Sequence, residues 1–138
     1  MSEVRRAAEA ARDAAQRVAT LGTEQKNQYL RDLAGALVDA EEAILRANAS
    51  DIARAEDDGL SMPKLKRLGI SAESLAQMAQ GLRQVAALED PVAKITRDQV
   101  LENGLRVTRV RCPLGVVMMI YESRPNVTID AFSLCFKS

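Results

Sequence analysis

Apolar residues recur every three or four positions through the first two-thirds of the chain, which is the spacing of one face of an α-helix. The pattern predicts a first helix that ends at Gly22 and a second that Thr23 can cap. A cap within Asn48–Asp51 then starts a short third helix, which ends at Gly59, and two further helices follow before Asp90. The predicted apolar faces comprise Val4, Ala8, Ala11, Ala15, Val18, Leu30, Leu33, Leu37, Ile44, Leu75, Met78, Leu82 and Val85.

The spacing changes after residue 91 to short apolar runs separated by turn residues. Asn103 and Gly104 form a strong signal for a two-residue hairpin turn, between a strand that contains Ile95 and Val100 and a return strand over Leu105–Arg111. Basic residues interrupt the alternation of the return strand, which indicates an exposed edge strand or a bulge. Its arginines are interpreted as solvated edge charges rather than as phosphate ligands.

A continuous apolar run of strand length, Val116–Ile120, lies between Gly115 and a polar cluster. A strand that is covered on both faces has this composition, whereas a half-exposed strand alternates. The conformational restriction at Pro125, and at Arg124 before it, favours a turn, and Asn126 can cap the helix that follows. Because a parallel sheet needs further strands, this strand is expected to expose apolar surface or to be covered by another chain.

The turn between that strand and that helix is the candidate functional segment. A strand, a tight polar turn and a helix N-terminus form the arrangement in which α/β enzymes hold anionic ligands. Arg124 can meet a carboxylate or a phosphate there with two parallel hydrogen bonds. The alternative is a connection whose polar side chains only cap the helix and contact solvent, and the local pattern does not separate the two.

Composition narrows the possible chemistry. The 138 residues are enough for one domain with a modest core, and 47% of them are apolar. The formal net charge is zero, which argues against the basic surface typical of nucleic-acid or membrane binding. The N-terminus is charged and rich in alanine, unlike a signal peptide. Two cysteines far apart, with no secretory signal, indicate a reducing compartment, and a cytoplasmic location is expected.

The chain contains no histidine, which removes Ser-His and Cys-His nucleophile pairs and histidine-based metal sites. Two cysteines cannot complete a four-ligand zinc site, so no metal is expected. Cys135 lies between Leu134 and Phe136, where no neighbouring cation in the sequence would activate a thiolate, and both it and Cys112 are interpreted as core residues. The G-x-G-x-x-G motif of many dinucleotide-binding folds is absent.

Several runs carry a family resemblance. The most specific is Tyr-Glu-Ser-Arg-Pro-Asn-Val-Thr at Tyr121–Thr128, preceded by Pro-Leu-Gly-Val at Pro113–Val116, and Asp130–Ser138, Asn48–Asp51 and Asp90–Val92 fit as well. These runs resemble the gamma-glutamyl phosphate reductases (glutamate-5-semialdehyde dehydrogenases), a family of the aldehyde dehydrogenase superfamily. The resemblance spans nearly the whole chain. Because proteins of that family are much longer, it covers only their N-terminal portion.

The resemblance implies an α/β fold of the aldehyde-dehydrogenase type. A helix-rich N-terminal portion would span residues 1–91, a β-hairpin residues 92–112, and the first strand–helix unit of a truncated, parallel α/β cofactor-binding domain residues 113–138. The implied protein is an NADP-dependent oxidoreductase of proline biosynthesis, which reduces gamma-glutamyl phosphate to glutamate-5-semialdehyde and phosphate. In the family, a cysteine thiolate attacks the acyl phosphate, phosphate leaves, and hydride from NADPH reduces the thioester. That cysteine lies beyond residue 138, so the isolated chain is expected to be inactive.

The resemblance also implies roles within the turn. Aldehyde dehydrogenases carry an asparagine there that helps to stabilise the oxyanion, and the turn lines the nicotinamide end of the cofactor. Arg124 falls at the position of that asparagine and Asn126 two residues later, so the oxyanion role stays open between them. Arg124 is alternatively a ligand for the acyl phosphate or for the glutamate carboxylate. The implied site residues are Ile120, Tyr121, Glu122 and Ser123 for the cofactor, and Arg124 and Asn126 for the substrate.

The implied partners are gamma-glutamyl phosphate, glutamate 5-kinase and further copies of the full-length protein in a homo-oligomer, with no nucleic acid and no membrane. Two alternatives stay open. One is a reductase of the same superfamily for another acyl phosphate or aldehyde, although a plain aldehyde dehydrogenase should carry Trp-Asn or a near relative at the turn. The other is a non-enzymatic helical interaction module, which would fold by itself into a stable oligomer.

Overall fold

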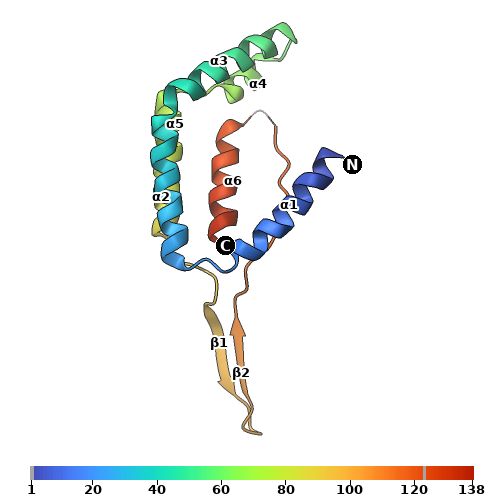
Figure 1. Ribbon diagram of the computed structural model, residues 1–138, viewed down its shortest axis with the longest axis vertical. Helices are drawn as coiled ribbons and strands as arrows, with labels where there is room; N and C mark the ends of the chain where they lie inside the picture. The colour runs from blue at the N-terminus through green and yellow to red at the C-terminus, as the bar shows by residue number, and fades with distance from the viewer. Residues whose placement is uncertain (1, 123) are drawn as a thin grey trace.

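The computed structural model describes residues 2–122 and 124–138, and within them it is mainly helical with one β-hairpin (Figure 1). Among the described helices, none is long and apolar enough to cross a membrane. The elements are α1 (Glu3–Val18), α2 (Thr23–Asp39), α3 (Glu41–Asp57), α4 (Met62–Leu68), α5 (Ala72–Ala87), β1 (Ile95–Val100), β2 (Arg106–Val110) and α6 (Pro125–Lys137).

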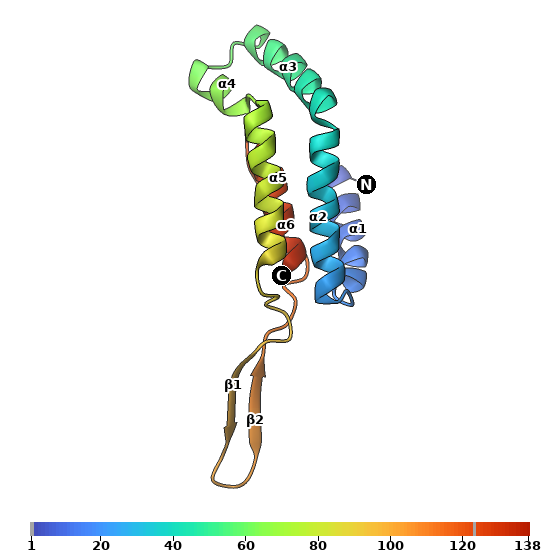
Figure 2. The same cartoon turned by 90° about the vertical axis from the view of Figure 1, so that its left-hand side faces the viewer.

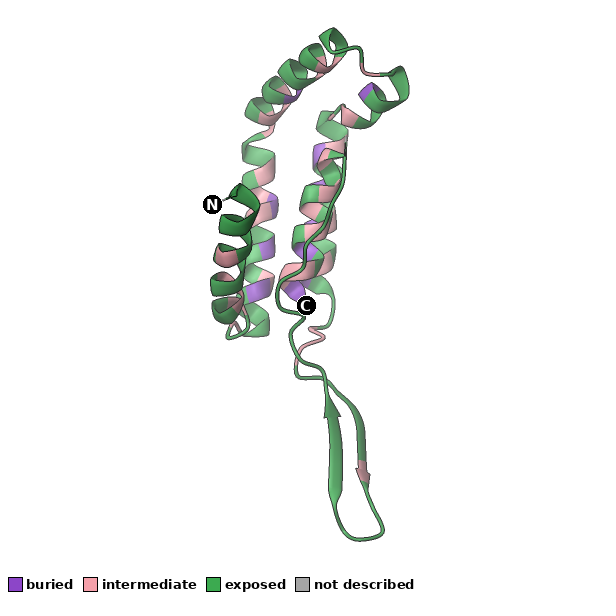
Figure 3. Cartoon of the chain, turned by 90° about the vertical axis from the view of Figure 1, so that its right-hand side faces the viewer, coloured by how far each residue is buried: buried purple, intermediate pink, exposed green. Residues whose placement is uncertain are grey.

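The hydrophobic core lies where α2, α5 and α6 meet. α2 and α5 lie side by side, and α6 packs against both of them (Figures 1 and 2). Figure 3 shows buried positions among the packed helices, while the hairpin is exposed almost throughout. Because alanines occupy several of the central positions, these helices can approach closely. The innermost buried side chains are Leu30, Ala34, Ala79, Leu82 and Ala86.

The helix predicted after Ser71 is confirmed. Ser71 and Ser74 exchange side-chain to backbone hydrogen bonds at the start of α5, with distances of 2.8 and 3.1 Å, which satisfies two backbone donors that the helix itself cannot. Leu75, Met78 and Leu82, which share the predicted apolar face, are buried. α1 behaves differently, because none of its residues is buried and its apolar face is only partly covered.

The predicted cap at Asn48–Asp51 is wrong. The chain breaks between α2 and α3 at Ala40 instead, and Asn48 lies in the middle of α3. Its side chain is 6% exposed and bridges to the connection between α4 and α5. The amide Nδ2 donates to the backbone oxygen of Leu68 (2.9 Å), and Oδ1 accepts from the backbone nitrogen of Ile70 (2.8 Å). Asn48 therefore satisfies backbone groups of another segment, a role that its local sequence does not reveal.

A buried polar cluster fixes the C-terminal end of α6. Lys26 of α2 forms an ion pair with Asp90 at 3.3 Å and also donates to the backbone oxygen of Lys137 at 3.3 Å. Lys137 in turn donates to the backbone oxygen of Ala86 in α5 at 3.1 Å. Asp90 accepts a further hydrogen bond from Thr23, which was predicted to cap α2 but is its first residue, since Gly22 occupies the capping position. Since buried charges are tolerated only when they are paired and hydrogen-bonded, this cluster defines how the three helices meet.

The predicted hairpin forms, with a different turn. β1 and β2 pair antiparallel. The return strand β2 is exposed along its whole length, as one of the two expectations had it, while the register shift lies in β1, between Ile95 and Arg97. In the turn, the backbone nitrogen of Gly104 donates a hydrogen bond to the oxygen of Leu101 (2.9 Å), and of the two predicted turn residues Gly104 alone has a positive φ, at 84°. A two-residue turn of the Asn-Gly type needs positive φ at both residues, so the loop is the longer kind with a left-handed glycine.

The predicted buried strand at Gly115–Tyr121 is not formed in the structure. Residues 112–122 belong to no helix or strand, and the apolar run is exposed, with Met118 at 74% and Ile120 at 86%. The expectation that this run would expose apolar surface is confirmed, whereas the strand covered on both faces is not found among the described residues. Cys112, which was expected in a core, is exposed, and Cys135 in α6 is half-buried.

Candidate functional site

The turn at residues 121–126 joins the extended segment to α6. Pro125 is the first residue of the helix, where its fixed φ suits the helix and its missing N–H costs no hydrogen bond. Arg124 therefore occupies the capping position, with φ −144° and ψ 80°, and its side chain makes no capping hydrogen bond. Asn126 is not the cap that was predicted, because its Nδ2 donates to Asp130 one turn further along (3.3 Å).

Two side-chain contacts hold this turn in place. The hydroxyl groups of Tyr121 and Thr128 lie 2.6 Å apart, which ties the start of the turn to α6. Glu122 forms an ion pair with Lys64 of α4 at 2.8 Å. The hydrogen bond from Lys64, together with its positive charge, lowers the pKa of Glu122 below the ordinary value of a glutamate. Glu122 therefore remains a carboxylate at neutral pH and links the turn to α4.

The structure brings part of the predicted site together. Tyr121, Glu122 and Arg124 are exposed at the N-terminal end of α6, as is Asn126 in its first turn. Ile120 precedes them in the extended segment and is 86% exposed. Ser123 lies outside the described residues. The exposed turn leaves the guanidinium of Arg124 available to an anion, next to the backbone donors of the helix N-terminus.

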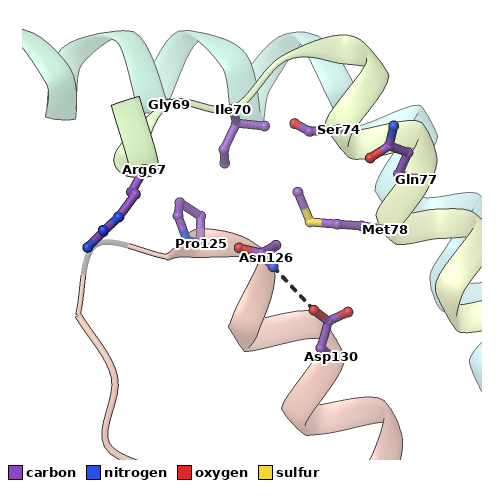
Figure 4. A pocket seen from close by; sticks show the side chains of 9 residues that line it. All are labelled: Arg67, Gly69, Ile70, Ser74, Gln77, Met78, Pro125, Asn126 and Asp130. Carbon is purple, nitrogen blue, oxygen red and sulfur yellow. Dashed lines mark hydrogen bonds between the residues drawn. The ribbon is translucent and has the colours of Figure 1, made fainter. Parts of the chain in front are cut away.

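A hollow of about 260 Å³ lies beside the turn, between α6 and the segment that runs from α4 into α5 (Figure 4). Sequence reasoning identified Asn126 within it but missed Arg67 and Gln77, because helical periodicity gives no sign that two exposed polar residues face a distant turn. Asp130 was part of the run Asp130–Ser138 that carries the family resemblance, but no role was predicted for it. The residues that line the hollow are Arg67, Gly69, Ile70, Ser74, Gln77, Met78, Pro125, Asn126 and Asp130.

Opposite charges occupy the two ends of this hollow. Figure 4 shows Arg67 at one end and Asp130 at the other, with Pro125 and Asn126 between them. Neither Cys112 nor Cys135 lines the hollow. With no histidine in the chain, the described residues offer groups that bind and orient a ligand, and they do not form a nucleophile–base pair there.

Comparison with known proteins identifies relatives over the whole chain. No protein-family model matches it. It is 47% identical over 138 residues to the gamma-glutamyl phosphate reductase of Xylella fastidiosa (strain 9a5c), covering all of the chain and 33% of that protein. It is 48% identical over 136 residues to the gamma-glutamyl phosphate reductase of Moorella thermoacetica, covering 99% of the chain and 32% of that protein. The resemblance found in the sequence is confirmed.

Solved structures give the same result for the backbone. The crystal structure of gamma-glutamyl phosphate reductase from Thermotoga maritima matches 99% of this chain, with a TM-score of 0.93 and 33% sequence identity, and the match covers 33% of the Thermotoga chain. The corresponding structure from Saccharomyces cerevisiae matches the whole of this chain, with a TM-score of 0.91 and 37% sequence identity, and the match covers 35% of the yeast chain. The chain spans about a third of the length of the curated relatives that it matches.

Proposed function

Because the chain is homologous over its whole length to gamma-glutamyl phosphate reductases, we propose that it is the N-terminal part of such an oxidoreductase. The proposed reaction is the reduction of gamma-glutamyl phosphate by NADPH and a proton to glutamate-5-semialdehyde, NADP and phosphate, a step of proline biosynthesis. The observation that carries the proposal is the match of sequence and backbone over the same 138 residues. A cytoplasmic location is part of the proposal and is supported by the two unpaired cysteines.

The turn supplies the proposed contribution of this chain to the substrate site. Arg124, exposed at the capping position of α6, binds an anionic oxygen of the substrate through its planar guanidinium. The backbone donors of the first turn of α6 add to that attraction. Glu122 keeps the turn in position through Lys64 and does not itself meet substrate. Asn126, which donates to Asp130, orients that carboxylate.

NADP fits the described residues in part. Its reduced form, NADPH, would supply hydride when it is bound. The exposed apolar run that ends at Ile120 and Tyr121 offers an apolar surface against which a flat ring can pack. Residues 113–138, which include this run, are the proposed start of the cofactor-binding domain. Residues 1–91 and 92–112 would form the proposed helical portion and hairpin beside it.

The nucleophile of the proposed reaction does not come from this chain. Cys135 lies within α6 among apolar neighbours of a separate groove, and Cys112 is exposed in the extended segment. We therefore expect the 138-residue chain alone to be inactive. The proposed partners are further copies of the full-length protein and glutamate 5-kinase, since an acyl phosphate is labile and benefits from direct delivery.

A chimera tests the proposal. This chain would replace the matching third of the Xylella fastidiosa reductase, with which it shares 47% identity. We expect the chimera to oxidise glutamate-5-semialdehyde with NADP in a phosphate-dependent reaction, the reverse of the proposed one, and to restore growth without proline to a bacterium that lacks the enzyme. The isolated chain should do neither.

The outcomes separate the parts of the proposal. A chimera that folds but is inactive, while the parent enzyme is active in parallel, would exclude the proposed function. Activity that prefers an unrelated aldehyde would favour another reductase of the superfamily. Turnover by the purified 138-residue chain would show that the nucleophile lies within it.

A further inference from the structure

Two charged side chains, Arg67 and Asp130, border the hollow beside the turn. Among the described residues, no ion pair involves Arg67 or Asp130. Within the part of the chain that the structure describes, the amide of Asn126 is the one donor to the Asp130 carboxylate, at Oδ2, and the other oxygen can accept from a ligand. Both charges border one hollow, which makes it a candidate site for a ligand with charges of its own.

The middle of the hollow is less polar than its ends. Ile70, Met78 and Pro125 contribute apolar surface there, and the amide of Gln77 adds a hydrogen-bonding group on α5 (Figure 4). The volume of about 260 Å³ is just below the range of about 300–1,000 Å³ that is typical of pockets for drug-sized ligands. The hollow therefore suits a small, extended molecule with a short apolar linker.

The substrate of the proposed reaction has this form. Gamma-glutamyl phosphate carries an ammonium and a carboxylate group at one end, a two-carbon linker, and an acyl phosphate at the other end. A simple phosphate or dicarboxylate would place negative charge against Asp130, which disfavours it. A ligand with an ammonium group at one end and a phosphate at the other matches the charge at each end of the hollow.

We propose that this hollow is the substrate-specificity site, in which the Asp130 carboxylate binds the α-ammonium group and the Arg67 guanidinium binds the phosphate end. The inference rests on the proposed function and adds to it the two residues that select the substrate. Asn126 positions the Asp130 carboxylate through its 3.3 Å hydrogen bond, and Gln77 lies where it can meet the α-carboxylate. Arg124, at the edge of the turn, remains free to act on the oxygen of the reacting carbonyl.

The test uses the active chimera in the oxidative direction. There the aldehyde and inorganic phosphate are separate substrates, each with its own Michaelis constant, and they correspond to the two ends of gamma-glutamyl phosphate. Glutamate-5-semialdehyde is compared with 5-oxopentanoate, the same aldehyde without the amino group. Asp130→Asn should raise the KM for glutamate-5-semialdehyde about tenfold, the loss of one hydrogen bond between charged groups, and leave the KM for 5-oxopentanoate unchanged. Arg67→Gln should raise the KM for phosphate about tenfold, for the same physical reason, and leave both aldehydes unchanged.

Matched controls separate these effects from general damage. Lys66→Gln removes a neighbouring exposed cation of α4, and Asp57→Asn removes an exposed carboxylate at the end of α3, and neither residue lines the hollow. Both controls should leave all three constants unchanged. Asp130→Glu keeps the charge and should keep the preference for the amino aldehyde, which guards against a folding defect in Asp130→Asn.

Each result supports or overturns the inference. An equal rise of KM for both aldehydes in Asp130→Asn, or no rise for either, would overturn the role of Asp130. An unchanged KM for phosphate in Arg67→Gln would overturn the role of Arg67. If the unsubstituted chimera shows no phosphate-dependent oxidation while the parent enzyme does, the proposed function fails and the inference fails with it.

Discussion

Replacing Asn48 by alanine tests whether a buried side chain, rather than a helix cap, joins α3 to the rest of the fold. Asn48 is 6% exposed, and its amide makes two hydrogen bonds, to Leu68 at 2.9 Å and from Ile70 at 2.8 Å. Both partners are backbone groups, one at the last residue of α4 and the other in the short connection to α5. Alanine would remove the two bonds and leave those backbone groups without their partner.

The expected loss of stability follows from these contacts. Each neutral hydrogen bond contributes about 1 kcal/mol net, so two contribute about 2 kcal/mol. Backbone groups left unsatisfied would add to the loss, although the half-burial of Leu68 and Ile70 lets water reach them in part. Alanine gains at most about 0.7 kcal/mol in helix propensity over asparagine, which opposes the loss. The net destabilisation should be about 2 kcal/mol.

Urea unfolding of the 138-residue chain, followed by circular dichroism of its helices, measures this change. With a slope of about 2 kcal/mol per molar urea, the midpoint of Asn48→Ala should fall by about 1 M. Ser50→Ala is the matched control in the same helix, because Ser50 is exposed and its hydroxyl donates to the backbone oxygen of Arg46 one turn earlier (3.3 Å), and its midpoint should hardly move. If both variants unfold at the same urea concentration as the unsubstituted chain, the bridging role of Asn48 is wrong.

Two further predictions concern the polar cluster and the extended segment. Burial alone raises the pKa of Asp90, but hydrogen bonds from Val92, Thr23 and Lys26 hold it below the ordinary value of 3.8. Asp90 therefore stabilises the fold above that pH, and this stability is lost as the pH falls through the lowered pKa, so urea midpoints at pH 7 and pH 3 should differ less in Asp90→Asn than in the unsubstituted chain. Replacing both Met118 and Ile120 by lysine should reduce the fluorescence of an apolar dye on the isolated chain without moving its urea midpoint, because these side chains are 74% and 86% exposed. A clear fall of that midpoint would show that the segment is packed in solution.

The sequence predicts those features whose cause is local. α5 is one, since its serine cap and its apolar face lie within a single helix. The hairpin is another, although the turn type was wrong, because the left-handed conformation at Gly104 suits more than one loop length. The prediction that Asn48 belongs to a helix cap was wrong because the role of this side chain is not local. An asparagine that caps a helix and one that bridges to a segment 20 residues away have the same local pattern, and only the fold distinguishes them.

The apolar run at Val116–Ile120 shows a different limit of sequence reasoning. Its composition indicates that the run needs to be covered on both faces. Composition does not indicate whether the described residues provide that cover. In the structure they do not, so the run stays extended and exposed.

The candidate site depends on contacts that no local pattern contains. The turn at residues 121–126 has a recognisable sequence, yet its position comes from Lys64, 58 residues away from Glu122 in the chain. At the other end of α6, Lys26 reaches the backbone of Lys137 across 111 residues. Since α6 is held at both ends by such contacts, the charges of Arg67 and Asp130 come to face one hollow only when α2, α4, α5 and α6 are assembled. A substitution in the polar cluster should therefore disturb the hollow as well as the stability, whereas a substitution in the hollow should leave the cluster intact.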